Sequence, residues 1–170
     1  MLSYRPANLD TDRDFIIAMH ILGNFENDPA SLRLGDINAY RAWWGHAAQA
    51  SEFLEVIGET LQDERTIAEV WQEDSRPVGF LWVVFSRIAG YEMTVAEIND
   101  IEVAPTHQRL GIGTMILQHA EDLARERGAD LLRSETGVEN QGSLALHRKL
   151  GFVPYRTRFE KRLDCPDAVL

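Results

Sequence analysis

Cysteine is almost absent from this chain, which has a single one, Cys165, among its 170 residues. One cysteine cannot form an internal disulfide, and it cannot build a cysteine-rich zinc site. Apolar runs of about 18 residues, the length that crosses a bilayer, are also missing. The first residues lack the basic stretch and apolar core of a signal peptide. We therefore expect a cytoplasmic protein with no membrane segment.

Repeats, low-complexity segments and linkers are lacking as well, so we expect one domain that covers residues 1–170. This length is sufficient to bury a proper core and too short for two ordinary domains. Hydrophobic residues make up 45% of the chain and charged residues 26%, which is usual for globular proteins. Composition alone therefore indicates a globular domain without pointing to an activity.

Positive charge is scarce in the first hundred residues. They carry 17 Asp and Glu against 7 Arg, a net charge of −10, whereas residues 101–170 carry 10 acidic and 10 basic side chains. An acidic half disfavours nucleic acid as a partner and favours a cationic one. The neutral half would not repel an anionic ligand. A solubilising surface is the alternative explanation of the same asymmetry.

Hydrophobic periodicity predicts an α/β fold without the regular βαβ alternation of a doubly wound sheet. We expect an α+β-type three-layer sandwich with a mixed, mostly antiparallel sheet, in the order β-α-α-β-β-β-α-β-α-β-β. The expected strands are 4–6, 66–71, 78–86, 95–103, 131–137, 152–153 and 156–163. The expected helices are 11–22, opened by a capping box from Thr11 to Asp14, then 37–61 with a possible break at Gly45, 112–127 and 143–150.

A glycine-rich turn, Gln108-Arg109-Leu110-Gly111-Ile112-Gly113, follows the strand that ends at 103 and opens directly into a helix. The first amides of a helix have no partner within it, and the macrodipole places partial positive charge there. Glycine has no Cβ, so a phosphate can approach the backbone closely. The turn therefore predicts a ligand that carries a pyrophosphate.

Two common phosphate-binding motifs do not match this turn. A Walker A loop requires a lysine after its last glycine, and here Thr114 follows Gly113. A dinucleotide fingerprint requires a third glycine where this chain has Ile116. What remains is the pattern Q-x-x-G-x-G after V-A-P.

Two motifs between Glu97 and Phe152 resemble those of the GCN5-related N-acetyltransferase family. The central family motif, V-x-P-x-x-[QR]-x-x-G-x-[GA], is matched by Val103, Pro105, Gln108, Gly111 and Gly113. The second, N-x-x-A-x-x-L-Y-x-x-x-G-F, is matched by Asn140, Leu146, Gly151 and Phe152. The chain departs from the second motif at Ser143, which replaces the alanine, and at His147, which replaces the tyrosine.

The resemblance implies transfer of an acyl group, usually acetyl, from acetyl-coenzyme A to a primary amine without a metal. It also implies a bulge that splays the strand at 99–103 from the strand at 131–136, with the pantetheine arm in the gap. The implied cofactor-binding residues are Ile101, Glu102, Val103, Gln108, Arg109, Leu110, Gly111, Ile112, Gly113, Thr114 and Asn140. Arg109 is alternatively an exposed turn residue, and Asn140 a helix N-cap.

Glu97 is the candidate base. It precedes Gln108 by the same distance as the catalytic glutamate precedes the glutamine in the histone-acetylating branch of the family. By period-2 alternation Asp100 and Glu102 lie on the opposite face of the strand, an arrangement that a bulge would reverse. Alternatively, all three are ordinary strand carboxylates and an ordered water takes the proton.

His147 is the candidate acid, because the family tyrosine at its position is placed to protonate the coenzyme A sulfur. A histidine can also donate a proton. The alternative is a buried histidine on the helix face, satisfied by a backbone carbonyl. The other histidines have no carboxylate or cysteine at ligand spacing, and we expect no chemical role for them: His20, His46, His107 and His119.

The acceptor is expected to be a cationic amine held by the acidic half. In the resembled fold the first two helices line the acceptor side, and here they contribute Glu26, Asp28 and Asp36 with Trp43 beside them, whereas Trp44 has core spacing. We expect no nucleic acid or membrane partner, and a monomer or homodimer. Two alternatives are open: a non-catalytic sensor of acyl-coenzyme A, and an interaction domain in which the glycine turn is only a helix start.

Overall fold

A five-stranded sheet in the order β1-β2-β3-β4-β5 forms the centre of the computed structural model, which describes residues 1–25, 28 and 34–159. The strands are β1 (Leu2–Pro6), β2 (Thr66–Glu73), β3 (Arg76–Ile88), β4 (Met93–Val103) and β5 (Leu131–Ser134). Neighbouring strands are antiparallel except for β4 and β5, which are parallel. The predicted mixed, mostly antiparallel sheet is confirmed.

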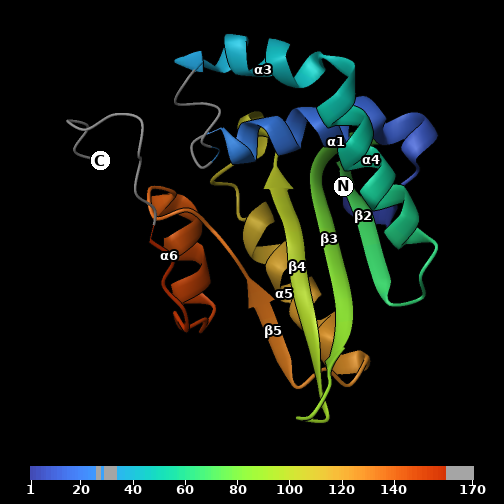
Figure 1. Ribbon diagram of the computed structural model, residues 1–170, viewed down its shortest axis with the longest axis vertical. Coiled ribbons are helices and arrows are strands. Elements are labelled where there is room, and N and C mark those ends of the chain that lie inside the picture. The colour runs from blue at the N-terminus through green and yellow to red at the C-terminus, as the bar shows by residue number, and fades with distance from the viewer. Residues whose placement is uncertain (26–27, 29–33, 160–170) are drawn as a thin grey trace.

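Helices cover both faces of this sheet, which confirms the three-layer arrangement (Figure 1). On one face lie α1 (Leu9–Asn24) and α4 (Ala47–Leu61), with α3 (Ile37–Gly45) packed against them. On the other face lies α5 (Ile112–Glu126), and α6 (Gln141–Lys149) stands beside it. The predicted break in the second helical region is present, because α3 ends at Gly45. No helix in the described ranges is long and apolar enough to span a bilayer.

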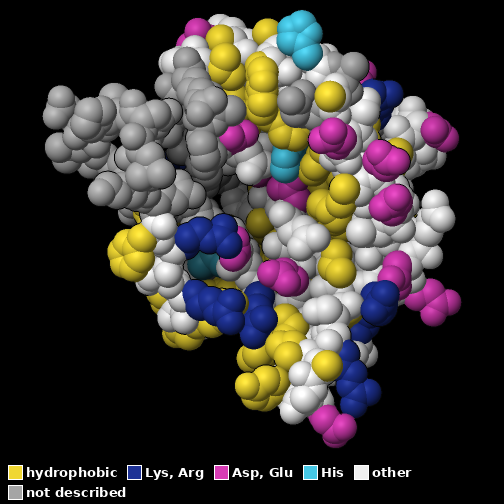
Figure 2. All heavy atoms as spheres, in the orientation of Figure 1, with side chains coloured by type: hydrophobic (Ala, Val, Ile, Leu, Met, Phe, Trp, Pro, Cys, Tyr) yellow, Lys and Arg dark blue, Asp and Glu magenta, His cyan; other side chains and the backbone are white. Residues whose placement is uncertain are grey.

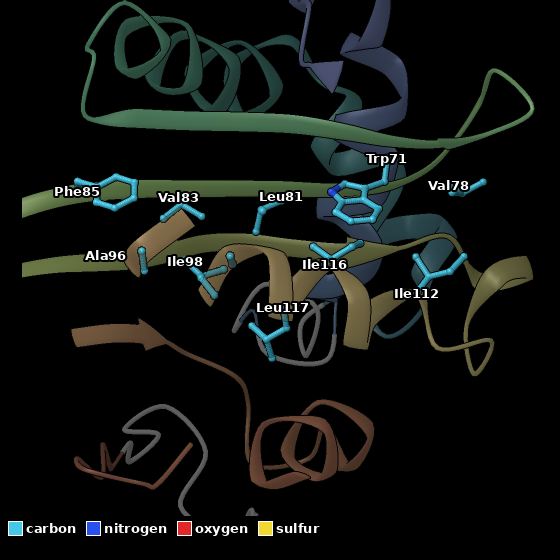
Figure 3. Packing of buried hydrophobic residues seen from close by; sticks show 12 residues of the cluster. Trp71, Val78, Leu81, Val83, Phe85, Ala96, Ile98, Ile112, Ile116 and Leu117 are labelled. Atoms are coloured by element: carbon cyan, nitrogen blue, oxygen red, sulfur yellow. The ribbon is translucent and has the colours of Figure 1, made fainter. Parts of the chain in front are cut away.

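The face of the sheet under α5 holds the largest cluster of buried apolar side chains (Figure 3). On α5 the apolar residues recur at helical spacing and point toward the sheet: Ile112, Ile116, Leu117, Ala120 and Ala124. Leu81, Val83 and Ile98 on β3 and β4 face them. Ile112, the first residue of α5, is already buried in this cluster. Its packing fixes the glycine turn, which directly precedes it, at the end of β4.

A bulge in β4 determines which face its carboxylates occupy. Val83 on β3 pairs with Ile98 and Trp82 pairs with Asp100, so Asn99 is the extra residue. On the near side of the bulge Glu97 pairs with Val84. Val84 and Trp82 both pack in the cluster under α1, which also contains Ile16, Ile57 and Phe80.

Partners across a ladder share a face, so Glu97 and Asp100 both lie on the α1 face, and so does Glu102, which pairs with Phe80. The prediction from simple alternation, that Glu97 lies opposite the other two, is wrong. The inserted residue shifts the alternation of side chains by one position. The face that was expected to carry Glu97 alone therefore carries all three carboxyls.

Strands β4 and β5 part soon after they meet. Their pairing runs from Val95 with Leu131 to Ile98 with Ser134, and within the described chain no pair follows. Beyond that rung β5 has ended, whereas β4 continues for five residues to Val103. The splay that the family resemblance implied is therefore confirmed. The strands part after Ile98, the residue that precedes the bulge at Asn99.

Two expectations about particular elements are wrong. Helix α1 begins at Leu9 and its N-cap is Asn8, whose side chain accepts a hydrogen bond from the amide of Asp10, so Thr11 does not open a capping box. Residues 152–159 form no strand, which removes the strand expected at 152–153 and the start of the one expected at 156–163. Residues 160–163 lie outside the described part of the chain.

Candidate active site

The turn before α5 presents a row of backbone amides. Gly111 is the N-cap of α5 with φ of 88°, and Arg109 also has a positive φ of 63°. No side chain caps the helix, and the first backbone bond runs from the amide of Met115 to the carbonyl of Gly111, at 3.1 Å. Among the described residues no hydrogen bond is donated by the amides of residues 109–114. Such a concave row suits an anionic phosphate group.

Gly113 and Gln108 join this turn to its neighbours. A Cβ on Gly113 would lie 3.3 Å from Leu146 Cδ2 and 3.7 Å from Val103 Cγ2, so the missing side chain lets α6 and the end of β4 approach the helix start. The side chain of Gln108 donates a hydrogen bond from Nε2 to the carbonyl of Val103, at 3.2 Å. Gly113 and Gln108 therefore hold the amide row close to the end of β4, where that strand has no β5 partner.

Asn140 is the N-cap of α6. Its Oδ1 accepts a hydrogen bond from the amide of Ser143, at 3.0 Å. The structure thus shows the alternative that the sequence left open, a capping asparagine. The cap uses the oxygen of the side-chain amide and leaves the amide nitrogen out of the cap.

His147 lies on α6 with both ring nitrogens in contact with neighbours. Its side chain is 9% exposed, and the ring meets the edge of Phe152. Nδ1 lies 2.8 Å from the carbonyl oxygen of Ser143, which can only accept, so Nδ1 carries a hydrogen. Nε2 lies 2.9 Å from Oγ of Ser134. The buried histidine satisfied by a carbonyl is present as predicted, and the second contact, to Ser134, was not expected.

The carboxylates on the α1 face of β4 have different surroundings. Glu97 is exposed, whereas Asp100 is only 8% exposed and lies 3.0 Å from Nδ1 of His20. Burial, with the nearby charge of Asp100, raises the pKa of Glu102 to about 9. The Glu102 carboxyl lies against α1 at Gly23, where a Cβ would come within 1.6 Å of Oε1. Near neutral pH this face therefore holds a protonated Glu102 beside Asp100.

His20 has a carboxylate partner that the sequence did not suggest. Besides the contact with Asp100, its ring stacks on Phe53 with centroids 3.8 Å apart and meets the edge of Trp44. His119 likewise contacts Glu69, with Nε2 and Oε2 2.8 Å apart. These carboxylate partners are 80 and 50 positions away in the sequence, so the spacing of residues along the chain could not show them.

The acidic groups expected to hold the acceptor have structural partners. Asp36 is the N-cap of α3, where its side chain accepts hydrogen bonds from two backbone amides. Asp28 accepts a hydrogen bond from the hydroxyl of Tyr40, at 2.7 Å. Trp43 packs among the aromatic side chains between α1 and α3, and Glu26 lies outside the described residues. Figure 2 shows acidic side chains over β4 and the helices above it, with Lys and Arg gathered over α6 and β5.

The raised pKa of Glu102 predicts a pH-dependent stability. The pKa of its carboxyl is 4.5 when unperturbed and about 9 in the folded chain, so between these values the folded state binds more protons than the unfolded state. The free energy of unfolding therefore falls as pH rises through that window. We expect Glu102→Gln to gain at least about 1 kcal/mol over wild type between pH 5 and pH 8, since one pKa unit corresponds to about 1.4 kcal/mol.

Urea unfolding of both proteins at the two pH values measures this difference. Glu92→Gln is the matched control, because it removes an exposed carboxyl just before β4. The control should follow the wild-type pH dependence. If Glu102→Gln followed it too, Glu102 would not be the buried acid that the structure indicates.

A family comparison agrees with this geometry. The sequence model of the acetyltransferase (GNAT) family matches residues 34–152, more than half of the chain. The chain belongs to the GNAT family. The match includes the glycine turn, the bulged strand β4 and all of α6.

Similar proteins of this family are matched over parts of their length. An N-acetyltransferase of Methanocaldococcus jannaschii is 36% identical over 84 residues, 49% of this chain and 37% of that protein. Streptothricin acetyltransferase of Streptomyces lavendulae is 47% identical over 56 residues, 33% of this chain and 30% of that protein. The chain thus spans about a third of the length of these curated relatives.

The fold is shared with solved structures over nearly the whole chain. The structure of AAC(6')-Iy in complex with the bisubstrate analogue CoA-S-monomethyl-acetylneamine has a TM-score of 0.68 and 18% identity. The superposition covers 97% of this GNAT chain and 99% of the other. At this identity the likeness establishes the fold alone.

Proposed function

We propose that this chain transfers an acetyl group from acetyl-coenzyme A to a primary amine, in the cytoplasm and as a monomer or homodimer. The observation that carries the proposal is the row of amides at residues 109–114, which opens beside the gap between β4 and β5. The row suits a pyrophosphate, and it follows directly on β4, the strand that carries the carboxylates of the α1 face. Family membership and the structural likeness to a coenzyme A analogue complex support the same cosubstrate.

The chemistry needs groups at three places around the thioester. The amine must lose a proton before its nitrogen attacks the carbonyl carbon. The carbonyl oxygen then carries negative charge, which a backbone amide of β4 beyond the bulge, near Val103, would stabilise. When the carbon–sulfur bond breaks, the sulfur keeps the electron pair and gains from a proton donor. No covalent intermediate on the protein is required.

Glu97 is the carboxylate on the α1 face that suits the base. It is exposed, and it pairs with Arg133 on β5. Only one further pair, Ile98 with Ser134, follows before β4 and β5 part. Glu102 has a pKa of about 9 and holds its proton near neutral pH, so it cannot accept another. Asp100 is buried against His20. Glu97, directly or through a water, is therefore the group we assign to this step.

We further propose that the acceptor amine is cationic. The three β4 carboxyls lie on the α1 face of the strand that passes the point where β4 and β5 part. A net charge of −10 in residues 1–100 attracts a cation over longer range. The name of streptothricin acetyltransferase and the acetylneamine analogue bound by AAC(6')-Iy make amine-bearing antibiotics the first acceptors to test.

Unfolding with and without acetyl-coenzyme A tests the function. At 100 times its dissociation constant the cosubstrate should add about 2.7 kcal/mol to the free energy of unfolding, provided that it binds only the folded chain. Thiol release should then be detected with at least one member of a panel of cationic amines. Stabilisation without turnover on any amine would indicate an acyl-coenzyme A sensor, and no stabilisation would indicate an interaction domain.

A further inference from the structure

Ser134 lies at the point where β4 and β5 part. It pairs with Ile98 on the last rung between the two strands, and the preceding rung pairs Glu97 with Arg133. Ile98 packs in the cluster under α5, so the side chain of Ser134 lies on the α5 face, whereas Glu97 lies on the α1 face. The candidate base and this hydroxyl therefore stand on adjacent rungs at the edge of the gap, on opposite faces of the sheet.

The hydroxyl of Ser134 is bonded to His147 in a way that suits two protonation states. Nδ1–H of the ring donates to the Ser143 carbonyl, at 2.8 Å, in both states. When the ring is neutral, Nε2 accepts the hydrogen of Ser134 Oγ, at 2.9 Å. When the ring is protonated, Nε2–H donates to Oγ, and the hydroxyl hydrogen turns to another acceptor. Protonation of His147 thus frees the Ser134 hydrogen.

The ring of His147 is itself poorly placed to act on a ligand. It is 9% exposed, and Ser143 and Ser134 occupy its two nitrogens. Ser134, at the last rung of β5, borders the gap. An imidazole is also shorter than the phenol that the family motif carries at this position. The hydroxyl of Ser134, bonded to Nε2, makes up this difference in length. A proton that moves from His147 to the gap therefore passes through Ser134.

We propose that Ser134 delivers the proton to the leaving sulfur of coenzyme A and that His147 supplies it. This inference rests on the proposed function and adds the residue that touches the leaving group. As the carbon–sulfur bond breaks, the sulfur takes the electron pair and the hydrogen of Ser134 Oγ. The oxygen takes the hydrogen of protonated His147 Nε2, and the ring becomes neutral. Solvent returns the proton to His147 before the next turnover.

Titration of the thiol of bound coenzyme A tests this inference without an acceptor. When His147 is protonated, the freed hydrogen of Ser134 Oγ donates to the sulfur and stabilises the thiolate, so the loss of this hydroxyl in Ser134→Ala should raise the pKa of the bound thiol by about one unit. Ser134→Thr keeps the hydroxyl and should keep the wild-type value. Ser143→Ala is the matched control, because its hydroxyl contacts the other ring nitrogen, at 3.2 Å, and its carbonyl is retained.

Kinetics with an acceptor give the second measurement. Ser134→Ala should lower kcat by about 10²-fold while KM for acetyl-coenzyme A changes little, and His147→Ala should have a similar effect. The double variant should be no slower than the slower single variant, because the two residues act as one unit.

Two results separate the possible failures. Coenzyme A that binds with the same thiol pKa in Ser134→Ala and wild type would overturn the inference and leave the proposed function standing. A wild-type chain that does not bind coenzyme A would overturn both. A loss of kcat in Ser134→Thr equal to that in Ser134→Ala would show that Ser134 only supports the packing of α6 on β5, and would also overturn the inference.

Discussion

Gly111→Glu is expected to abolish coenzyme A binding, with a loss of affinity of at least about 100-fold, while the fold is retained. The new carboxylate would stand in the row of amides and would repel a pyrophosphate that those amides attract. No atom lies within 4 Å of the position of the added Cβ, so the side chain enters open space. The φ of 88° costs a residue other than glycine about 1–2 kcal/mol, which a stable domain tolerates.

Gly128→Glu is the control for this prediction. Gly128 follows the other end of α5, has φ of 68°, and also has open space at its Cβ position. The control variant therefore carries the same new charge and a similar backbone strain, away from the amide row. Calorimetric titration of both variants with coenzyme A measures the difference. Equal affinities in Gly111→Glu and wild type would remove the phosphate site from the start of α5.

Glu97→Gln is expected to lower kcat by about 10²–10⁴-fold and to leave the dissociation constant of acetyl-coenzyme A within about threefold of wild type. The amide has nearly the shape of the carboxylate but cannot accept the proton of the attacking amine. Glu97 is exposed on the α1 face, so the substitution removes no buried contact. Steady-state rates together with binding titrations of the same variant separate the two quantities.

Glu92→Gln supplies the comparison, since it makes the same exchange at an exposed position before β4 and should keep the wild-type rate. Asp100→Asn tests the competing assignment. A chain that loses its rate through Asp100→Asn and keeps it in Glu97→Gln would place the base at Asp100 and His20 rather than at Glu97.

Local patterns were enough to predict the elements that build the cofactor side. The apolar spacing from Ile112 to Ala124 predicts α5, and the two glycines at its start, Gly111 and Gly113, predict an open row of amides. Both depend on residues that are close in the sequence, where periodicity and φ preferences act directly. The strands at the chain end could not be judged in this way, because an apolar run such as the one at 152–153 forms a strand only where a neighbouring strand offers hydrogen bonds.

The catalytic side depended on contacts that no local pattern contains. His20 and Asp100 meet across 80 positions, and His147 meets Ser134 across 13. Glu102 has a raised pKa because α1 covers it at Gly23. Each of these properties comes from the packing of one element on another, so an individual histidine or glutamate in the sequence carries no sign of it.

By itself the sequence determined the order of the elements through α6, the family and the phosphate-binding character of the turn at 108–113, because these follow from short-range spacing along the chain. Only the tertiary structure decided which carboxylates share the α1 face and which hydroxyl stands beside His147. The physical reason is the bulge at Asn99, which shifts the alternation of β4 by one residue, together with the early end of β5 at Ser134. A one-residue insertion in a ladder moves every later side chain to the other face of the sheet. The position of the insertion can be located only when the pairing with the partner strand is known.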